Sequence, residues 1–446
     1  MRCRVLFWIV AVLLFGEGVP PVGTGFAEST PWMRVPDERF GQGWGLLDLE
    51  NLYDFGRWEE TNSLTGDWGG LRHQLYDAGI AIMGSYENQI AANPATGRVR
   101  TVRDADTLSA AAFFDLDRLA GLTDTFFLVS MAEREGKSTS ADIPNLFPVQ
   151  QVYGGETIRL DHLAIEKGFL EGRFDVVAGR INALDDFAVS NFYCYSQNGG
   201  ICGSPLSLET NASLSNYPFA SWGIRGRYDL EPDLYSMTGV YNTWENFASN
   251  KYHGVDFSIR HDSGVAVMQE FGYRPISLRQ AGYPGFIKLG GLYDSEPRHP
   301  FPDGGEIAGN WMVYALAQQR IFRRACDGFS QGLTGFLTFT YSPPATNATE
   351  YFADGGLVYR GLVPSRKDDA LGAFAVFGES SPDYRDAQRA VHESVQTYEM
   401  VLELNYRVQV SSWSAIQPDL QYIVRPDGTG RTGNALVLAL YTTIRF

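Results

Sequence analysis

The sequence predicts an all-β chain that forms a transmembrane antiparallel β-barrel of about 16 strands, preceded by a short N-terminal periplasmic helix. Three observations support this fold class. Segments of strand length recur from residue 80 onward, the connections between them alternate between long and short, and the sequence ends on a strand whose last residue is Phe446. Outer-membrane barrels combine these features because their periplasmic turns are short and their extracellular loops are long.

The composition argues against several other classes of protein. The 446 residues include 48 Gly, 28 Phe, 23 Tyr and 9 Trp, and the formal net charge is -16. A disordered chain is poor in aromatic residues, and a helical membrane protein needs several apolar runs of about 20 residues. The acidic balance argues against a nucleic-acid partner, which would require a basic surplus. The mean hydropathy of -0.18 excludes membrane helices but not a barrel, whose strands are apolar only at alternate residues.

The N-terminus predicts export. Arg2 and Arg4 precede the apolar run VLFWIVAVLLFG, and a Pro/Gly-rich segment then ends at Ala27. A basic start, an apolar core of about 12 residues and small residues before the cleavage position are typical of a secretory signal peptide. The alternative, a membrane anchor, would need a longer run to cross about 30 Å of hydrocarbon. The expected organisation is a signal peptide at 1–27, an N-terminal periplasmic segment with a short helix at 28–79, and an outer-membrane barrel at 80–446.

Strands are predicted where β-branched and aromatic residues concentrate between Gly, Pro, Asn and Asp. Most segments have about 10 to 16 residues, a length that suits a tilted membrane crossing. In order, they are 80–92, 107–116, 124–133, 156–169, 172–182, 217–228, 233–245, 263–273, 285–295, 309–321, 329–341, 356–365, 370–379, 394–409, 414–425 and 434–446.

The predicted connections fall into two length classes. Those after odd-numbered strands up to the thirteenth have about 13 to 34 residues, whereas those after even-numbered strands mostly have about 2 to 7, with one near 11. The final loop is intermediate in length. A soluble sandwich has no reason to sort its connections in this way, but an outer-membrane barrel does.

Side chains alternate in polarity along the clearest strands. In the segment 394–409, Leu402 and Leu404 lie on one face, and Glu403 and Asn405 lie on the other. A soluble sandwich that buries its apolar faces would show the same alternation. The sorted connections, the strand lengths and the terminal aromatic residue favour the barrel, with apolar faces toward lipid and polar faces toward an aqueous lumen.

The segment LTGDWGGLRHQLYDAGI, from Leu64 to Ile80, predicts a short helix rather than a strand. Its helix signals are capping residues, a pair of leucines four residues apart and a closing glycine, namely Thr65 or Asp67, Leu71 with Leu75, and Gly79. We interpret this helix as a structural seal for the lower rim of the barrel.

Cysteine usage agrees with export. Cys3 leaves with the signal peptide, while Cys194 and Cys202 flank a Gly-Gly turn in FYCYSQNGGICGSP. In an oxidising compartment this spacing favours a local disulfide. The alternative is a metal site, but two thiols without neighbouring His or Cys make a poor zinc site. Cys326 has no predicted partner.

Several motifs resemble a known family. The segment Leu64–Ile80 is similar to the N-terminal motif of the carbohydrate-selective porins, the OprB family, and AGRINALDDFAVSNFYCYSQNGGICGSP, GGLVYRGLVPSRKDDALG and IQPDLQYIVRPDGTG resemble later blocks. The resemblance covers nearly all of the mature chain. It implies a sixteen-stranded outer-membrane barrel through which small sugars, glucose among them, diffuse into the periplasm. Outer-membrane lipid and, through Phe446, the assembly machinery are further expected partners, and a homo-oligomer is left open.

Selectivity in so wide a barrel has to come from a constriction. The longest predicted loop, 182–216, follows the fifth strand and contains the proposed disulfide, so its inward folding would narrow the pore. Sugars offer hydroxyls and apolar ring faces, so charged or amide groups beside aromatic rings would bind them. The candidate pore-lining residues, from the polar strand faces and the root of this loop, are Glu87, Arg159, Asp161, Arg180, Arg225, Arg227, Lys288, Arg360, Glu403 and Arg407.

Little in the sequence points to an enzyme. Acidic residues are abundant, but no pair stands out as an acid-base couple, and HDSG at His261 is no triad because geometry sets those roles. The six His residues show no metal-ligand spacing, so we expect no metal and no cofactor. Besides a sugar porin, the residues leave open a porin for other solutes and a secreted soluble β protein that binds glycans.

Overall fold

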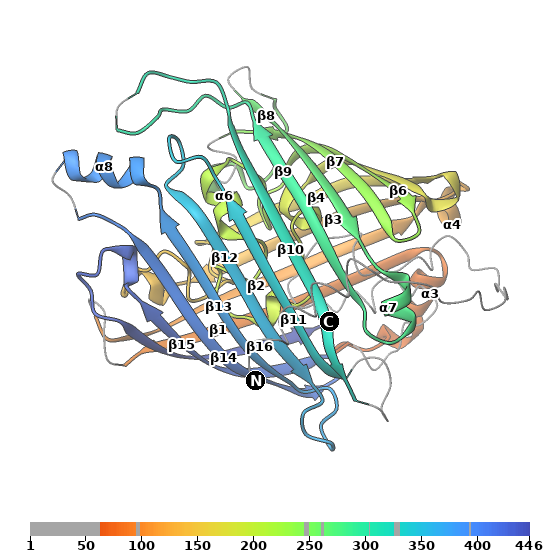
Figure 1. Cartoon of the computed structure of the whole chain (residues 1–446). Helices are drawn as coiled ribbons and strands as arrows, with labels where there is room; N and C mark the ends of the chain where they lie inside the picture. Colours follow the sequence, from red (N-terminus) through yellow and green to blue (C-terminus); the bar gives the residue numbers. More distant parts are fainter. Residues whose placement is uncertain are drawn as a thin grey trace.

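The computed structural model describes residues 63–94, 99–244, 249–259, 263–302, 304–324, 331–391 and 394–446. Within these ranges, sixteen antiparallel strands form a closed barrel in which consecutive strands pair and β1 pairs with β16 (Figure 1). The predicted fold class is therefore confirmed. The predicted signal peptide 1–27, the part of the next segment up to residue 62, His261 and Cys326 lie outside the described residues.

The strands of the barrel have these bounds: β1 Ile80–Asn93, β2 Thr101–Asp115, β3 Thr125–Gly136, β4 Thr157–Phe169, β5 Phe174–Ile181, β6 Ser221–Glu231, β7 Leu234–Thr243, β8 Gly264–Tyr273, β9 Gly285–Asp294, β10 Asn310–Arg323, β11 Gly332–Tyr341, β12 Thr349–Arg360, β13 Ala370–Ser380, β14 Tyr398–Ser411, β15 Ser414–Val424 and β16 Ala435–Arg445. The described α-helices are α3 Leu71–Asp77, α4 Leu116–Ala120, α5 Ala183–Asp186, α6 Leu206–Asn211, α7 Ile276–Gln280 and α8 Pro382–Ala390. Short 3-10 turns are η5 Trp68–Gly70, η6 Thr139–Ala141, η7 Leu170–Gly172, η8 Tyr193–Tyr195, η9 Asn250–Tyr252 and η10 Pro426–Gly428. Within the described ranges, no helix has the length and apolar character needed to cross a membrane.

The polarity of alternate residues sets the two faces of the wall. On β14, Glu403 and Asn405 are buried on the inner face, whereas Leu402 and Leu404 are 43% and 50% exposed on the outer face. The same division holds on β11, where Leu337 is 62% exposed on the outer face. Leaving so many apolar side chains in water would cost about 25 cal/mol per Å², so this outer surface fits a lipid surround.

The two ends of the barrel carry different connections. Connections after even-numbered strands lie at what we call the turn end, and those after odd-numbered strands lie at the opposite, loop end. Figure 1 shows α3, α4 and α7 toward one end of the barrel and α8 at the other. The length classes are less strict than predicted, because the loop-end connections 94–100 and 342–348 are short.

The short loop-end connections arise because β2 and β12 begin earlier than predicted. In β2 the polar start of the strand pairs with the end of β1, where Thr101 lies opposite Asn93. In β12 the Asp-Gly-Gly run resembles a turn, but Asp354 is buried on the inner face. A Cβ at Gly356 would lie 2.3 Å from Phe374 Cδ1, so glycine is needed there for close packing against the neighbouring strand β13.

The helix α3 forms at the predicted position but buries a different face. Leu71 is exposed, whereas Arg72 is buried. Asp67 Oδ1 accepts a hydrogen bond from the backbone N–H of His73 at 2.8 Å, so Asp67 rather than Thr65 supports the first turn. Gly79, with φ of +96°, ends the helix in the left-handed conformation that favours glycine.

Arg72 fastens α3 to the seam where the barrel closes. Its Nη1 donates to Ser63 Oγ at 2.6 Å, and its Nη2 donates to the carbonyls of Ile82 and Phe446 at 2.8 and 2.7 Å. The Phe446 ring packs over Gly84, where a Cβ would lie 2.9 Å from Phe446 Cδ2. The N-terminal motif and the last residue therefore meet at the turn end of the β1–β16 seam.

Candidate functional site

The connection after β5, residues 182–220, folds into the barrel, and we call it the long inner loop. Its apolar side chains Leu184, Phe187 and Leu208 are fully buried in one cluster with inward-facing residues of the wall. The Phe187 ring packs edge-on against Tyr241 of β7, with 6.2 Å between ring centroids. Burial of each such side chain stabilises the folded loop by about 1.5–3 kcal/mol relative to its exposure to water. This favours the inward path of the loop.

A disulfide bond joins Cys194 and Cys202 within the long inner loop. It closes the segment that runs from the middle of η8 past the Gly199-Gly200 turn. Both cysteines are buried inside the barrel. The cross-link shortens the freely moving part of the loop at the place where the loop faces the lumen.

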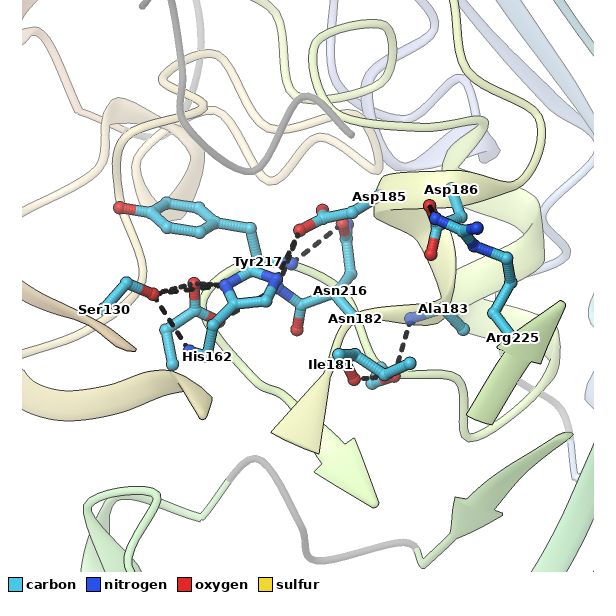
Figure 2. A network of polar contacts seen from close by, with 12 residues as sticks. Ser130, His162, Ile181, Asn182, Ala183, Asp185, Asp186, Asn216, Tyr217 and Arg225 are labelled. Carbon is cyan, nitrogen blue, oxygen red and sulfur yellow. Dashed lines mark hydrogen bonds and ion pairs between the residues drawn. The ribbon is translucent and has the colours of Figure 1, made fainter. Parts of the chain in front are cut away.

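The first polar anchor of the long inner loop is a buried network around His162 of β4 (Figure 2). His162 Nδ1 lies 2.7 Å from Asp161 Oδ2, and its Nε2 lies 3.3 Å from Asp185 Oδ2 in α5. Asn182 Nδ2 donates to both carboxylates at 2.9 Å. Ser130 Oγ of β3 accepts the backbone N–H of His162 at 2.9 Å. The network ties the start of the loop to two neighbouring strands.

The second anchor is the buried guanidinium of Arg225 on β6. It pairs with Asp175 of β5 and, at 3.2 Å, with Asp186 of α5. Burial raises the pKa of the Asp186 carboxyl, and the charge and hydrogen bond of Arg225 oppose this shift. Figure 2 shows Arg225 reaching from its strand toward Asp186. The cation therefore links the wall to the loop.

The third anchor is Glu270 of β8, which is completely buried. Its Oε2 accepts the backbone N–H of Ala188 in the long inner loop at 3.0 Å and the Tyr314 hydroxyl at 2.7 Å. Its Oε1 accepts the Tyr235 hydroxyl at 2.6 Å. Three donors thus satisfy one carboxylate and fix the loop backbone against β7, β8 and β10.

The fourth anchor is Glu403 of β14, on the opposite wall. Its carboxylate accepts Ser196 Oγ at 2.6 Å and the backbone N–H groups of Gln197 and Asn198 at 2.8 and 3.2 Å. Asn405 Nδ2 donates to the same carboxylate at 2.7 Å. Glu403 therefore holds the disulfide-closed part of the loop through charge-assisted hydrogen bonds.

A second connection, residues 137–156 after β3, also folds inward, and we call it the short inner loop. Ile143, Phe147 and Val149 are buried in the lumen. Glu399 of β14 accepts the backbone N–H of Phe147 at 2.9 Å, and Gln150 Nε2 donates to the Gln89 carbonyl of β1 at 2.6 Å. This inward path was not predicted from the sequence. The apolar residues in IPNLFPV were the available signal, because a loop surrounded by water rarely carries so many.

A cavity of about 170 Å³ lies between the two inner loops and the inner wall of β1, β2 and β3. Its lining combines charges, amides and aromatic rings. The side chains of these kinds are Glu87, Arg134, Gln151, Tyr153, Glu209, Asn216, Tyr217 and Phe219. Such a combination suits a ligand that offers both hydroxyl groups and an apolar ring face.

The lining residues hold one another in place. The Arg134 guanidinium lies over the Tyr217 ring at 5.1 Å, and the Tyr217 hydroxyl lies 2.5 Å from Ser109 Oγ. Asn216 Nδ2 donates to Glu209 Oε2 at 2.9 Å. Burial raises the pKa of the Glu209 carboxyl above its ordinary value, while the Asn216 hydrogen bond and the Arg134 charge oppose the shift.

Half of the ten predicted pore-lining residues form hydrogen bonds or ion pairs with the long inner loop. Those that bind it directly are Asp161, Arg180, Arg225, Lys288 and Glu403. Lys288 Nζ, for example, donates to the carbonyl of Val189 at 3.0 Å. These charges position the loop.

The other predicted residues are spread over the inner wall. Glu87 lines the cavity, and the Arg159 guanidinium lies 4.5 Å from the ring centroid of Phe219, which also lines it. Arg407 Nη2 donates to Thr443 Oγ1 at 3.4 Å. At the turn end, Arg227 lies over the Tyr235 ring and Arg360 ends β12.

Sequence reasoning missed Arg134, Glu209 and Tyr217. Arg134 fell one residue beyond the predicted third strand, whereas β3 continues to Gly136. Tyr217 was assigned to the start of a strand, but β6 begins at Ser221 and leaves Tyr217 in the long inner loop. Glu209 lies on α6, whose place in the lumen depends on contacts that no local pattern encodes.

Comparisons with known proteins agree with this architecture. The family model described as carbohydrate-selective porin, OprB family, matches residues 99–446. The chain is 29% identical over 417 residues to Porin B of Pseudomonas aeruginosa, covering 84% of this chain and 90% of that protein. The high-pH structure of Pseudomonas putida OprB has a TM-score of 0.82 at 26% identity and covers 87% of this chain and 99% of that one. Its low-pH structure has a TM-score of 0.58 at 23% identity and covers 87% and 100%.

Proposed function

The chain belongs to the carbohydrate-selective porin, OprB family, and from this premise we propose that the cavity between its inner loops is the sugar-selective constriction. The protein is an outer-membrane porin for passive diffusion of small sugars. The observation that carries the proposed site is its lining, where Tyr217 and Phe219 stand beside Glu87, Arg134 and amide groups.

The proposed site acts by offering a sugar two kinds of contact. The rings of Tyr217 and Phe219 can pack against the apolar face of a sugar ring, while Glu87, Arg134 and Gln151 can exchange hydrogen bonds with its hydroxyls. These contacts replace part of the hydration shell that a solute must shed in a narrow opening. Binding of this kind speeds passage only if it remains weak, since the sugar must also leave.

Further parts of the proposal concern assembly and export. The turn end, with α3 and Phe446, faces the periplasm, because barrels of this class have short periplasmic turns. Residues 1–27 act as a signal peptide, and the assembly machinery recognises the last strand through Phe446. The family and the barrel indicate a channel. We also propose that the protein has no catalytic activity.

Liposome swelling tests the proposed function. Glucose should enter faster than amino acids of similar size, and a disaccharide should enter more slowly than glucose. Rates that depend on solute size alone would indicate a general porin and would contradict the sugar preference. Protein that carbonate washing releases from membranes would contradict the barrel insertion itself.

The substitution Arg134→Gln tests the proposed constriction. It should weaken glucose binding in the channel about tenfold, because a charged hydrogen-bond donor is lost from the opening. The measurement is the glucose concentration that half-blocks the ion current through single channels in a planar bilayer. Arg431→Gln, at an exposed position in a loop-end connection, is the matched control and should leave this value unchanged. Similar half-blocking concentrations for both variants would argue against the site.

The raised pKa of Glu209 predicts a pH effect on ion selectivity. This carboxyl takes up a proton at a higher pH than an ordinary glutamate, because burial is the largest influence on its pKa. As the pH falls through that raised pKa, the proposed constriction loses a negative charge. The cation-to-anion permeability ratio of the channel should then fall about twofold. Reversal potentials in a salt gradient measure this ratio. In Glu209→Gln, the ratio should already be low at neutral pH and change less, and an unchanged profile would refute the assignment.

A further inference from the structure

A second, larger cavity of about 610 Å³ lies in the lumen at the turn end. Its lining comes from the connections after β4, β6 and β8, from the inner wall, and from Asn191 of the long inner loop. Asn191 is exposed although its loop lies inside the barrel. The cavity therefore lies between the underside of the long inner loop and the turn end, where a solute that has passed the constriction would arrive.

Arginine is the most frequent charged residue in the lining of this cavity. Among the described lining residues, four are arginine, namely Arg173, Arg227, Arg274 and Arg279, and three are acidic, namely Asp175, Asp229 and Glu231. Asp175 is already paired with Arg225 within the wall. The remaining balance favours an anionic ligand.

Two of these arginines are held on one aromatic ring. The guanidinium carbons of Arg227 and Arg274 lie 4.1 and 5.1 Å from the ring centroid of Tyr235. Both guanidinium groups also approach Asp229 Oδ1, at 3.4 and 3.8 Å. Arg173 Nη2 donates to the Asp229 carbonyl at 3.3 Å. Three guanidinium groups thus converge on one residue at the floor of the cavity.

The ring beneath the arginines is itself fixed. Tyr235 is buried, and its hydroxyl donates to Glu270 Oε1 at 2.6 Å. The other oxygen of Glu270 accepts the backbone N–H of Ala188 in the long inner loop. The arginine pair is therefore preorganised by the same carboxylate that positions the loop, which lowers the entropic cost of binding a ligand.

Another side of the lining, from the long inner loop, β9 and β10, has a different chemistry. Asn191 and Gln318 contribute amide groups, and Phe286 contributes an apolar ring. Ser190 Oγ donates to Gln318 Oε1 at 2.7 Å, which fixes the orientation of that amide. Amides exchange hydrogen bonds with hydroxyl groups, and an aromatic ring can pack on a sugar carbon skeleton. This side suits the polyhydroxylated part of a ligand.

We propose that this cavity is an exit subsite for sugar acids, with the carboxylate bound by Arg227 and Arg274 and the hydroxylated chain facing Asn191 and Gln318. Guanidinium groups match carboxylates through paired hydrogen bonds, whereas neutral sugars gain less from such a cluster. The inference rests on the proposed function, since it assumes that sugars reach the lumen. It extends the cargo of the channel to anionic sugars.

Current block in planar bilayers at constant ionic strength tests the subsite, with glucose, gluconate or acetate added on the periplasmic side. Gluconate should half-block the wild-type channel at a concentration about tenfold lower than glucose or acetate does. Arg274→Gln should raise the gluconate value about tenfold and leave the glucose value unchanged. Arg431→Gln is the charge-matched control and should change neither value.

Three outcomes would overturn the subsite: equal block by gluconate and glucose, equal block by gluconate and acetate, or an Arg274→Gln variant that loses glucose and gluconate block together. Heat-modifiable migration of the variant establishes that the barrel is folded before the currents are compared. Glucose swelling is measured in parallel. If glucose is excluded from the liposomes but gluconate blocks the current as expected, the proposed function is contradicted and the subsite stands. If glucose enters but gluconate does not block as expected, the subsite alone is contradicted.

Discussion

Replacing Glu403 by alanine is expected to widen the channel. The Glu403 carboxylate accepts hydrogen bonds from Ser196, Gln197 and Asn198 of the long inner loop, on the side of the barrel opposite the Arg225 anchor. Hydrogen bonds to a charged group contribute about 1.5–3 kcal/mol each, and alanine also removes the carboxylate that accepts the buried N–H of Gln197. The disulfide-closed part of the loop should then leave the β14 wall.

The measurement is single-channel conductance together with the size limit for sugars in liposome swelling. Conductance should rise at least about twofold, and disaccharides should enter at rates closer to that of glucose. Glu403→Gln should have a smaller effect because its amide oxygen can still accept a hydrogen bond. Glu135→Gln, at an exposed position of β3, is the control. A folded Glu403→Ala barrel with wild-type conductance would show that apolar packing alone holds the loop.

The wall of the barrel could be predicted because its determinants are local. Leu402 and Leu404 alternate with Glu403 and Asn405, and this period of two residues assigns each side chain to a face without knowledge of any other strand. Closure follows once every strand pairs with its neighbours, as the pairing of β1 with β16 shows. An error arose at the start of β12, where the Asp354-Gly355 pair resembles a turn but lies within the strand.

The lumen could be predicted only in part, because its contacts join distant segments. Inward charges such as Glu403 were identified, but its partner Ser196 lies 207 residues away and depends on the path of the long inner loop. The same holds for Arg134 and Tyr217, which meet only after that loop has folded. Residue type and strand face therefore predict which side chains enter the lumen, while loop packing decides which of them a solute meets.

Removing the Arg225 cation is expected to destabilise the barrel itself. Arg225 is buried between Asp175 and Asp186, so Arg225→Met leaves two carboxylates in a low-dielectric site without their cation. Breaking a buried ion pair in this way costs about 3–5 kcal/mol. The temperature at which the protein changes its migration in detergent should fall by about 5 °C or more.

A compensating variant can show whether the expected loss of stability comes from the unpaired carboxylates or from lost side-chain packing. In the triple substitution Arg225→Met, Asp175→Leu and Asp186→Leu, the two carboxylates that pair with Arg225 are removed together with the cation, and apolar replacement of a buried ion group is often neutral or stabilising. The transition temperature should recover, whereas the tie between β6 and α5 is broken in both variants, so both should have a conductance above the wild-type value. Recovery of both properties would mean that Arg225 contributes stability but does not position the loop. Failure of the triple variant to regain stability would mean that side-chain packing, rather than the buried charge, dominates at this position.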